Sequence, residues 1–213
     1  MADEATWREA SEAAREIGKT GLEVWTTEEH PEVVMFFEER GYEETFRYLR
    51  YALDVPGAPD PGDPRHEVTT LSARPGLLPD VYALALETYP DQPGREDAEI
   101  GAIDDWRGFA VAPNPPDAFV VALENGNPIG FGILAVDGDV GEHAHTGVAE
   151  PWRGQGVAES IKRAHIRWAK ANGLRLLRTA NEVRIPQMIR LNERYGYRPE
   201  PAEIVLRGPL APA

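Results

Sequence analysis

The sequence has 213 residues, contains no cysteine and carries a formal net charge of −14 at pH 7. Without cysteine the chain has no thiol nucleophile, disulfide or thiolate metal ligand of its own. Hydrophobic residues make up 42% of the chain, enough for an ordinary globular core. No apolar run of about 18 residues occurs and residues 1–18 are charged throughout, so we expect a soluble, cytoplasmic protein without membrane contact.

The charge is distributed unevenly along the chain. Residues 1–63 hold 6 basic and 16 acidic side chains, residues 64–150 hold 4 and 15, and residues 151–213 hold 12 and 5. Charged residues usually form solvated faces, but a basic third on an acidic body also suits a polyanion site. The acidic remainder would repel a long nucleic acid backbone, so we expect no nucleic acid partner and favour a small phosphorylated cofactor.

Residues 1–53 are predicted to form a helix, a strand, a helix and a strand. The segment PEVVMFFEERGY, residues 31–42, resembles PQMIRLNERYGY, residues 186–197, at a constant offset in numbering. Any amphipathic helix that ends in Gly-Tyr would look alike, but the strand pattern upstream is shared as well. We therefore interpret residues 1–53 as an internal repeat of the C-terminal part.

A linker and an antiparallel hairpin follow. Residues 54–65 contain too many prolines and glycines for a helix or central strand, which indicates a linker. Residues 66–73 suit a strand, 77–89 a helix and 91–109 an acidic loop or short helices. Two β-rich runs flank Asn125 and Gly126, a turn dipeptide typical of hairpins, so residues 118–136 should form one. The next strand is expected at residues 140–149.

The last third begins with a glycine turn that opens a helix. Val157, Ile161, Ala164 and Trp168 recur at helical spacing, and Gly173 suits the end of that helix. A strand at 174–180, a helix at 186–196 and a last strand at 203–208 complete the pattern. Backbone N–H groups at such a helix start bind phosphate oxygens, although a short glycine turn is more often only punctuation. The turn matches neither the P-loop nor the dinucleotide fingerprint.

The turn and its surroundings resemble the GNAT superfamily of acyl-CoA N-acyltransferases, in an actinobacterial-type branch. Arg153-Gly154-Gln155-Gly156-Val157-Ala158 matches that family's pyrophosphate motif, and the resemblance covers residues 66 to about 206. It implies a mixed α/β fold in which the fourth and fifth strands of the family splay apart around the pantetheine arm. It also implies that the residues of the motif bind acetyl-CoA, together with Thr146, Gly147, Val148, Asn181, Met188 and Asn192.

The chemistry implied by the resemblance is direct attack of an amine on the thioester. The family often protonates the leaving thiolate with a tyrosine four residues before the Gly-Phe/Tyr pair, and here that position is Asn192. His143 and His145 are candidate bases because an imidazole pKa near ~6.5 suits proton removal at neutral pH. By the two-residue period of a strand they should share one face, with Glu142 on the other. A solvated pair of histidines is an equally good interpretation, and two histidines without a third ligand do not define a metal site.

These observations predict a degenerate partial GNAT-like repeat at 1–53, a linker at 54–65 and a complete GNAT acetyltransferase domain at 66–213. The half repeat lacks the glycine turn and should pack on the complete domain or on a second chain, as in a homodimer. A small cationic amine is the expected acceptor, because an acidic stretch lies where the family builds its acceptor wall: Asp91, Glu96, Asp97, Glu99, Asp104 and Asp105. A solvated loop, a non-catalytic acyl-CoA-binding or regulatory module and a protein acetyltransferase remain alternatives.

Overall fold

The structure is a computed structural model that describes residues 3–92, 99–183 and 186–212. Its chain divides into two compact units: residues 1–50, 181–186 and 199–213 form the first, and residues 51–180 and 187–198 form the second. Within the described residues no helix is long and apolar enough to cross a membrane. The predicted division at residues 53 and 65 stays a prediction.

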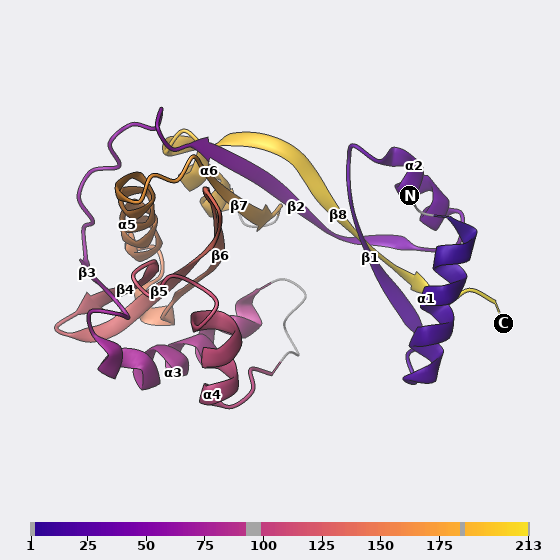
Figure 1. The fold of residues 1–213 in the computed structure, drawn as a ribbon, viewed down its shortest axis with the longest axis horizontal. Coiled ribbons are helices and arrows are strands. Elements are labelled where there is room, and N and C mark those ends of the chain that lie inside the picture. Colours follow the sequence, from indigo (N-terminus) through magenta and orange to yellow (C-terminus); the bar gives the residue numbers. More distant parts are fainter. Residues whose placement is uncertain (1–2, 93–98, 184–185, 213) are drawn as a thin grey trace. The chain divides into compact units, whose positions relative to one another are not determined.

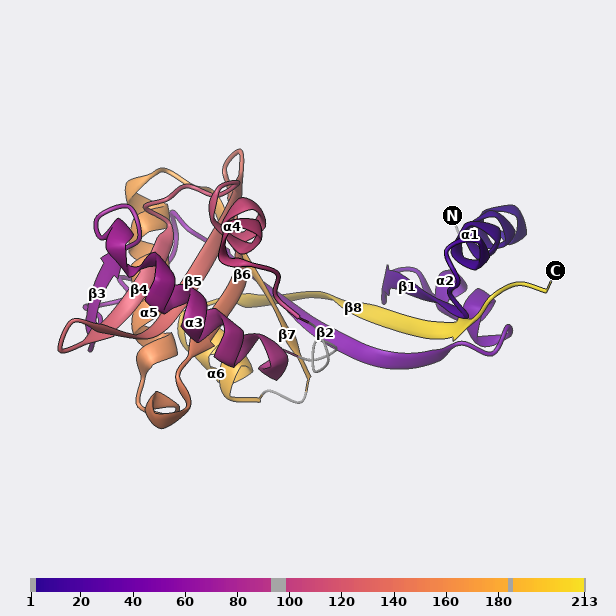
Figure 2. The same cartoon turned by 90° about the horizontal axis from the view of Figure 1, so that it is seen from below.

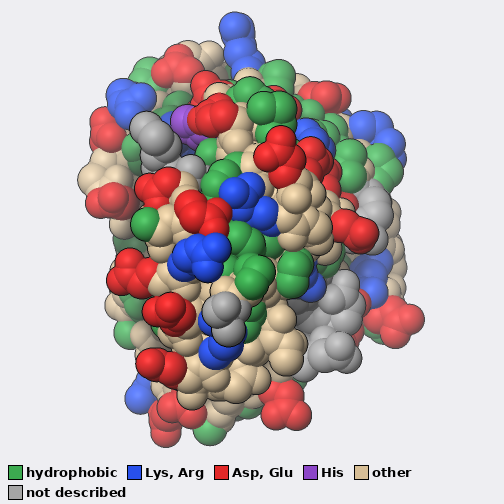
Figure 3. Space-filling model, turned by 90° about the vertical axis from the view of Figure 1, so that its right-hand side faces the viewer, with side chains coloured by type: hydrophobic (Ala, Val, Ile, Leu, Met, Phe, Trp, Pro, Cys, Tyr) green, Lys and Arg blue, Asp and Glu red, His purple; other side chains and the backbone are tan. Residues whose placement is uncertain are grey.

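The first unit packs two helices on a three-stranded sheet, with strand order β1-β8-β2 (Figures 1 and 2). Its elements are α1 (Glu4–Glu16), β1 (Gly21–Thr27), α2 (Pro31–Glu38), most of β2 (Glu43–Asp54) and β8 (Arg198–Pro209). The order helix, strand, helix, strand is the one predicted for residues 1–53. Strand β1 runs antiparallel to β8, which places Val24 opposite Leu206. On the face of the molecule shown in Figure 3, acidic and basic side chains are interspersed.

Apolar side chains from both helices and from β8 form the core of this unit. The buried members are Trp7, Phe37, Tyr42, Ile204, Leu206 and Ala211. The indole Nε1 of Trp7 donates to the hydroxyl of Tyr42 at 3.0 Å, and that hydroxyl donates to the Pro209 carbonyl at 2.8 Å. The polar ends of both rings are therefore satisfied, which buried Trp and Tyr generally require.

The second unit has the strand order β7-β6-β5-β4-β3. Its elements are β3 (Glu67–Thr70), α3 (Leu78–Thr88), α4 (Ile103–Trp106), β4 (Phe119–Glu124), β5 (Asn127–Asp137), β6 (Val140–Val148), α5 (Val157–Ala171), β7 (Leu176–Glu182) and α6 (Pro186–Arg194). Strands β6 and β7 are parallel, whereas the pairs β3–β4, β4–β5 and β5–β6 are antiparallel. The sheet is therefore mixed, as predicted.

The helices of this unit cover both faces of its sheet (Figure 1). Helices α3 and α4 pack on one face around Phe119 and Phe131, and α5 packs on the other. Glycines in β5 let α5 approach closely, because a Cβ added at Gly132 would lie 2.3 Å from Ile161 Cγ2. The predicted hairpin is confirmed, with Asn125 and Gly126 both at positive φ in its turn.

The secondary structure repeats along the chain at the offset that relates Pro31 to Pro186. These two prolines begin α2 and α6. Strands β1 and β7 are related by the same offset at both ends, and so are β2 and β8. The last residues of α1 and α5 follow it as well. Each position as far as Asp54 can therefore be compared with a position in the C-terminal part.

Candidate functional site

The glycine turn has the geometry that an anion site requires. Gly154 and Gly156 have φ values of +74° and +85°, a region that side chains with a Cβ rarely adopt, and α5 begins at Val157. The backbone N–H groups of Gly154, Gly156, Val157 and Ala158 have no hydrogen-bond partner within the described residues. Free N–H groups at a helix start, with the helix dipole behind them, favour a phosphate oxygen.

A groove of about 440 Å³ runs between this turn and α6. Several of the residues predicted to bind the cofactor line it: Val148, Arg153, Gly154, Gly156, Val157, Ala158 and Met188. Arg190 and Arg194 of α6 line it as well, which makes its α6 side basic. The groove therefore offers both backbone N–H groups and arginine side chains as hydrogen-bond donors. A phosphorylated ligand requires donors of this kind.

Some predicted residues are placed less favourably for the cofactor. Arg153 donates from Nη2 to Asp91 Oδ2 at 2.7 Å, so a phosphate would have to compete with that carboxylate. Gln155 is absent from the groove lining, and its carbonyl contacts the ring of His66 at 3.0 Å. Asn181 belongs to the first compact unit, so its role stays a prediction.

Strands β6 and β7 separate after Glu142 and Arg178. They pair only between Val140–Glu142 and Leu176–Arg178 within the described residues, so β6 from His143 onward has a free edge on that side. The splay implied by the family resemblance is thus present. Thr146 and Gly147 lie on this free segment, and Gly147 is tightly packed, since an added Cβ would lie 2.4 Å from Thr88 Oγ1.

A β-bulge in β6 separates the two candidate histidines. Ile133 pairs with His145, but Leu134 pairs with His143, so Ala144 is an extra residue in the ladder. The expectation that both histidines share one face is therefore wrong. His143 lies on the α5 face, where its ring contacts His165, and His145 lies on the α3 face, 6.2 Å from the stacked ring of Tyr89.

His145 is half-buried among aromatic rings. Its ring lies 5.0 Å from that of Phe131, and its Nδ1 contacts the side-chain amide of Gln92. Burial lowers the pKa of His145 to about 4, so the ring is neutral at physiological pH. An imidazole with a pKa of about 4 is a weak base and accepts a proton from an ordinary ammonium group only weakly, so any role as a base depends on bound substrate or water.

His143 belongs to a buried chain of hydrogen bonds with a fixed direction. His165 Nε2 lies 3.1 Å from the carbonyl oxygen of Ala118, which can only accept, so this nitrogen carries the proton. Its bare Nδ1 then accepts from His143 Nδ1 at 3.2 Å, and His143 Nε2 accepts from the Tyr197 hydroxyl at 2.6 Å. Both ring nitrogens of His143 are thus engaged.

The groups of this chain are neutral. Burial, together with the nearby charge of Lys162, lowers the pKa of His143 well below its ordinary value and that of His165 to about 4. Burial also raises the pKa of the Tyr197 phenol. His143 is therefore poorly suited to remove a proton from a substrate amine.

Helix α5 also carries a cation that the sequence pattern did not identify. Lys162 is only 3% exposed, and its Nζ donates to Asn192 Oδ1 at 2.6 Å. The helical spacing predicted that Ala164 and Trp168 lie on the buried face of α5. In the structure the buried residues of this helix include Lys162, His165 and Ile166 instead. The helical repeat consists of apolar residues only, so it does not reveal polar residues at buried positions. Tyr195, interpreted as a packing residue, is buried.

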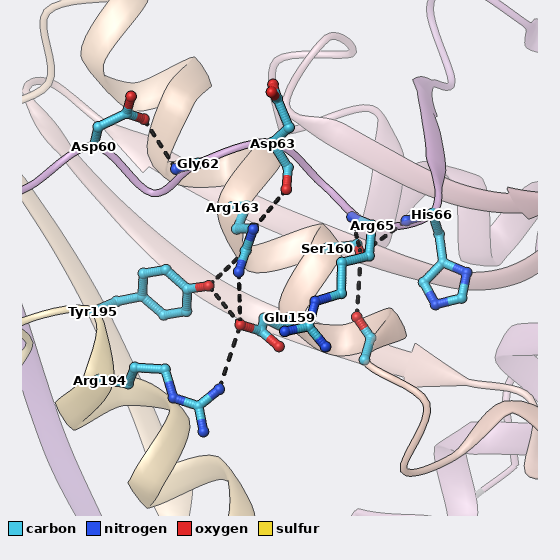
Figure 4. A network of polar contacts seen from close by, with 11 residues as sticks. Asp60, Gly62, Asp63, Arg65, His66, Glu159, Ser160, Arg163, Arg194 and Tyr195 are labelled. Carbon is cyan, nitrogen blue, oxygen red and sulfur yellow. Dashed lines mark hydrogen bonds and ion pairs between the residues drawn. The ribbon is translucent and has the colours of Figure 1, made fainter.

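A second polar network holds the start of α5 (Figure 4). Glu159 Oε1 accepts from the Tyr195 hydroxyl at 2.8 Å and from Arg163 Nη2 at 3.0 Å, and lies 3.4 Å from Arg194 Nη1. Burial raises the pKa of Glu159, but these hydrogen bonds and charges outweigh it and the net direction is down. Ser160 Oγ accepts from the backbone N–H of Arg65 at 3.1 Å. This hydrogen bond holds the segment before β3 against the first turn of α5.

The acidic stretch is only partly available to an acceptor. Asp91 is paired with Arg153, and Asp104 is paired with Arg107 at 3.1 Å. Glu96 and Asp97 lie outside the described residues. The prediction of an acidic acceptor wall stays a prediction.

The sequence matches the model of the Acetyltransferase (GNAT) family over residues 78–197, more than half of the chain. The chain belongs to this family. The matched GNAT region contains the turn, the bulged strand, Lys162 and Asn192, so the parts of the candidate site all lie within it. No curated protein matches the sequence.

Solved GNAT structures have the same fold. A GCN5-related N-acetyltransferase from Sphaerobacter thermophilus is 18% identical, with a TM-score of 0.73 over 98% of this chain and 67% of its own. A tandem GNAT protein from the clavulanic acid biosynthesis pathway is 18% identical, with a TM-score of 0.72 over 98% and 70%. The ribosomal-protein-S18-alanine N-acetyltransferase of Escherichia coli is 15% identical, with a TM-score of 0.51 over 70% and 96%.

Proposed function

We propose that this chain transfers an acetyl group from acetyl-CoA to a primary amine of a small cationic acceptor. The observation that carries the proposal is the turn at 153–158, where free backbone N–H groups and two left-handed glycines open onto a basic groove. Family membership supports acyl transfer in general, and the free N–H groups and basic lining of the groove support a phosphorylated acyl donor such as acetyl-CoA.

The residues of the chain bind and orient, and do not form a covalent intermediate. When bound, acetyl-CoA supplies the activated acyl group. The turn holds its phosphates, and the free edge of β6 offers backbone groups to an extended arm. The chain contains no cysteine, so direct attack by the amine is the economical route, and its rate enhancement comes from orientation and proton transfer.

The acceptor is proposed to bind on the α3 face of β6. His145 and Tyr89 lie on this face, and an aromatic face attracts a cationic amine. The acidic character of the chain outside its last third adds long-range attraction for a cation. A cytoplasmic location and a homodimer are also proposed, and sedimentation of the purified chain tests the second.

The cofactor site is tested by calorimetry with acetyl-CoA on Gly156→Leu. A leucine at φ +85° would be strained and would stand between the backbone and the pyrophosphate, so we expect affinity to fall about tenfold or more. Gly173→Leu is the matched control, because it introduces the same residue at φ +71° at the far end of the same helix. Unchanged affinity in a folded Gly156→Leu protein would contradict the proposed site.

A non-catalytic acyl-CoA-binding module is the second candidate. It is favoured by Asn192 at the position of the family's tyrosine and by the engaged ring nitrogens of His143. Thiol release measured over polyamines, amino acids, aminoglycosides and peptides separates the two functions. If CoA binds but no amine gives thiol above background hydrolysis, the module is the better description.

A further inference from the structure

Lys162 is a cation buried without a neighbouring carboxylate. Its Nζ contacts Asn192 Oδ1 at 2.6 Å and lies 4.6 Å from the centre of the Tyr197 ring, and no carboxylate contacts it within the described residues. Burial lowers the pKa of Lys162 to about 7, so both charge states are accessible near neutral pH. An uncompensated buried charge destabilises a fold, so the presence of Lys162 needs an explanation other than stability.

The N-terminal repeat, which lacks the glycine turn, has different residues at the positions that correspond to Lys162 and Asn192. At the offset that relates the two halves, Lys162 corresponds to Trp7, Asn192 to Phe37 and Tyr197 to Tyr42. Trp7 and Phe37 are buried in the core of the first unit, and Trp7 donates to the Tyr42 hydroxyl. The same three positions thus accept a fully packed aromatic cluster. The polar residues occur in the half that carries the glycine turn.

The groove leads to this pair. Ala158 of α5 and Met188 of α6 line the groove, and Lys162 and Asn192 lie four residues further along their respective helices. Residues four apart share one face of a helix, so the buried Lys162–Asn192 contact lies one helical turn beyond the lining residues Ala158 and Met188.

The length of the free strand edge agrees with this placement. It runs over six residues from Val148 at the groove to His143, which is five steps of ~3.3 Å or about 16 Å. The charge of Lys162 acts on His143 and His165, so the cation lies near the point where β6 and β7 separate. An extended arm of about this length that starts at the turn would bring its thiol end near Lys162.

We propose that Lys162, held by Asn192, is the group that receives the leaving thiolate of CoA and gives it a proton. As the amine nitrogen bonds to the acyl carbon, the carbon–sulfur bond breaks and sulfur keeps the electron pair. A proton passes from Lys162 Nζ to sulfur, CoA leaves as the thiol, and the neutral lysine regains a proton from solvent. The proton lost by the amine passes to water or a base. The inference rests on the proposed binding of CoA.

The titratable groups that face Lys162 do not compete for this role. His143 from β6 and His165 from α5 are neutral and bonded to each other, and the phenol of Tyr197 donates to His143. Their chain of hydrogen bonds ends at the Ala118 carbonyl, which cannot take up a proton. Lys162 is therefore the proton source of this cluster.

The test measures the thiol of bound CoA, and it requires no acceptor. The ultraviolet absorbance of the thiolate is followed against pH for CoA bound to the wild type, Lys162→Met, Lys162→Gln and Lys170→Met. A cation within contact distance stabilises a thiolate, so the midpoint should lie about 1–3 pH units below that of free CoA in the wild type. It should return to the free value or higher in both Lys162 variants, while CoA affinity remains within about threefold.

Lys170→Met is the matched control, because Lys170 is an exposed lysine on the same helix. It should titrate like the wild type. Equal midpoints in the wild type and both Lys162 variants, with CoA still bound, would overturn the role of Lys162 and leave the cofactor site intact. An equal shift in Lys170→Met would overturn it as well. Failure of the wild type to bind CoA would refute the proposed function itself.

Discussion

Lys162→Met should change how stability depends on pH. In the wild type the pKa of Lys162 falls from 10.5 to about 7 on folding. Below pH 7 both the folded and the unfolded chain carry the proton, so the cost of burying the charge applies in full. Between pH 7 and about 10.5 the folded chain has released the proton and the unfolded chain has not, so the wild type gains stability as the pH rises. Methionine removes this dependence.

The magnitude follows from the shift in the pKa. Each unit corresponds to about 1.4 kcal/mol, so between pH 6 and pH 10 the free energy of unfolding of the wild type should rise by about 4 kcal/mol relative to Lys162→Met. The lost hydrogen bond to Asn192 costs the variant about 1 kcal/mol at every pH. The variant should therefore be the more stable protein at pH 6 and the less stable one at pH 10.

Urea denaturation at pH 6, 7.5, 9 and 10 measures these differences directly. Lys170→Met removes an exposed lysine that donates to the Ala58 and Pro59 carbonyls, so its stability should differ from that of the wild type by an amount that does not vary with pH. A difference between the wild type and Lys162→Met that does not vary with pH would show that the lysine keeps an ordinary pKa. The physical account of the buried cation would then be wrong.

Three further results are expected. Glu159→Gln should lower the free energy of unfolding by about 1–2 kcal/mol in a denaturation experiment, because it removes the carboxylate charge that partly buried Arg163 and the Tyr195 hydroxyl share; no measurable loss would contradict the network. If His145 is the base, the rate of amine acetylation should not rise between pH 5.5 and 7.5 on its account, since its pKa is about 4 and it is already neutral there; a pH–rate profile with a His145-dependent midpoint near 6.5 would oppose this. Deleting residues 1–53 should reduce solubility and melting temperature by exposing the Leu206 side of β8, and an unchanged melting curve would show that the segment is dispensable.

The elements with strong local signals could be predicted from the sequence. Asn125-Gly126 fixed the hairpin because both residues adopt positive φ, and Gly173 at φ +71° ends α5 for the same reason. The glycine turn was identified by its position before a helix. In each case the signal lies within a few residues, so no tertiary information is required.

The chemistry of the site could not be predicted in the same way. A β-bulge at Ala144 depends on pairing with β5 and leaves no mark in the alternation of β6, so the two histidines were assigned to one face. Lys162 and His165 do not belong to the apolar repeat that predicted α5, so the sequence pattern did not indicate their burial. Their burial follows from the packing of α5 on a sheet whose glycines admit it closely, which is a tertiary effect.

The bulge at Ala144 gives one strand two independent surfaces. His143 is tied to the Lys162 side, while His145 faces α3. A substitution at position 145 can thus alter the α3 face of β6 without touching the hydrogen bonds that hold position 143. The selection of an acceptor and the handling of the cofactor could diverge separately in evolution, because a single additional residue has uncoupled them.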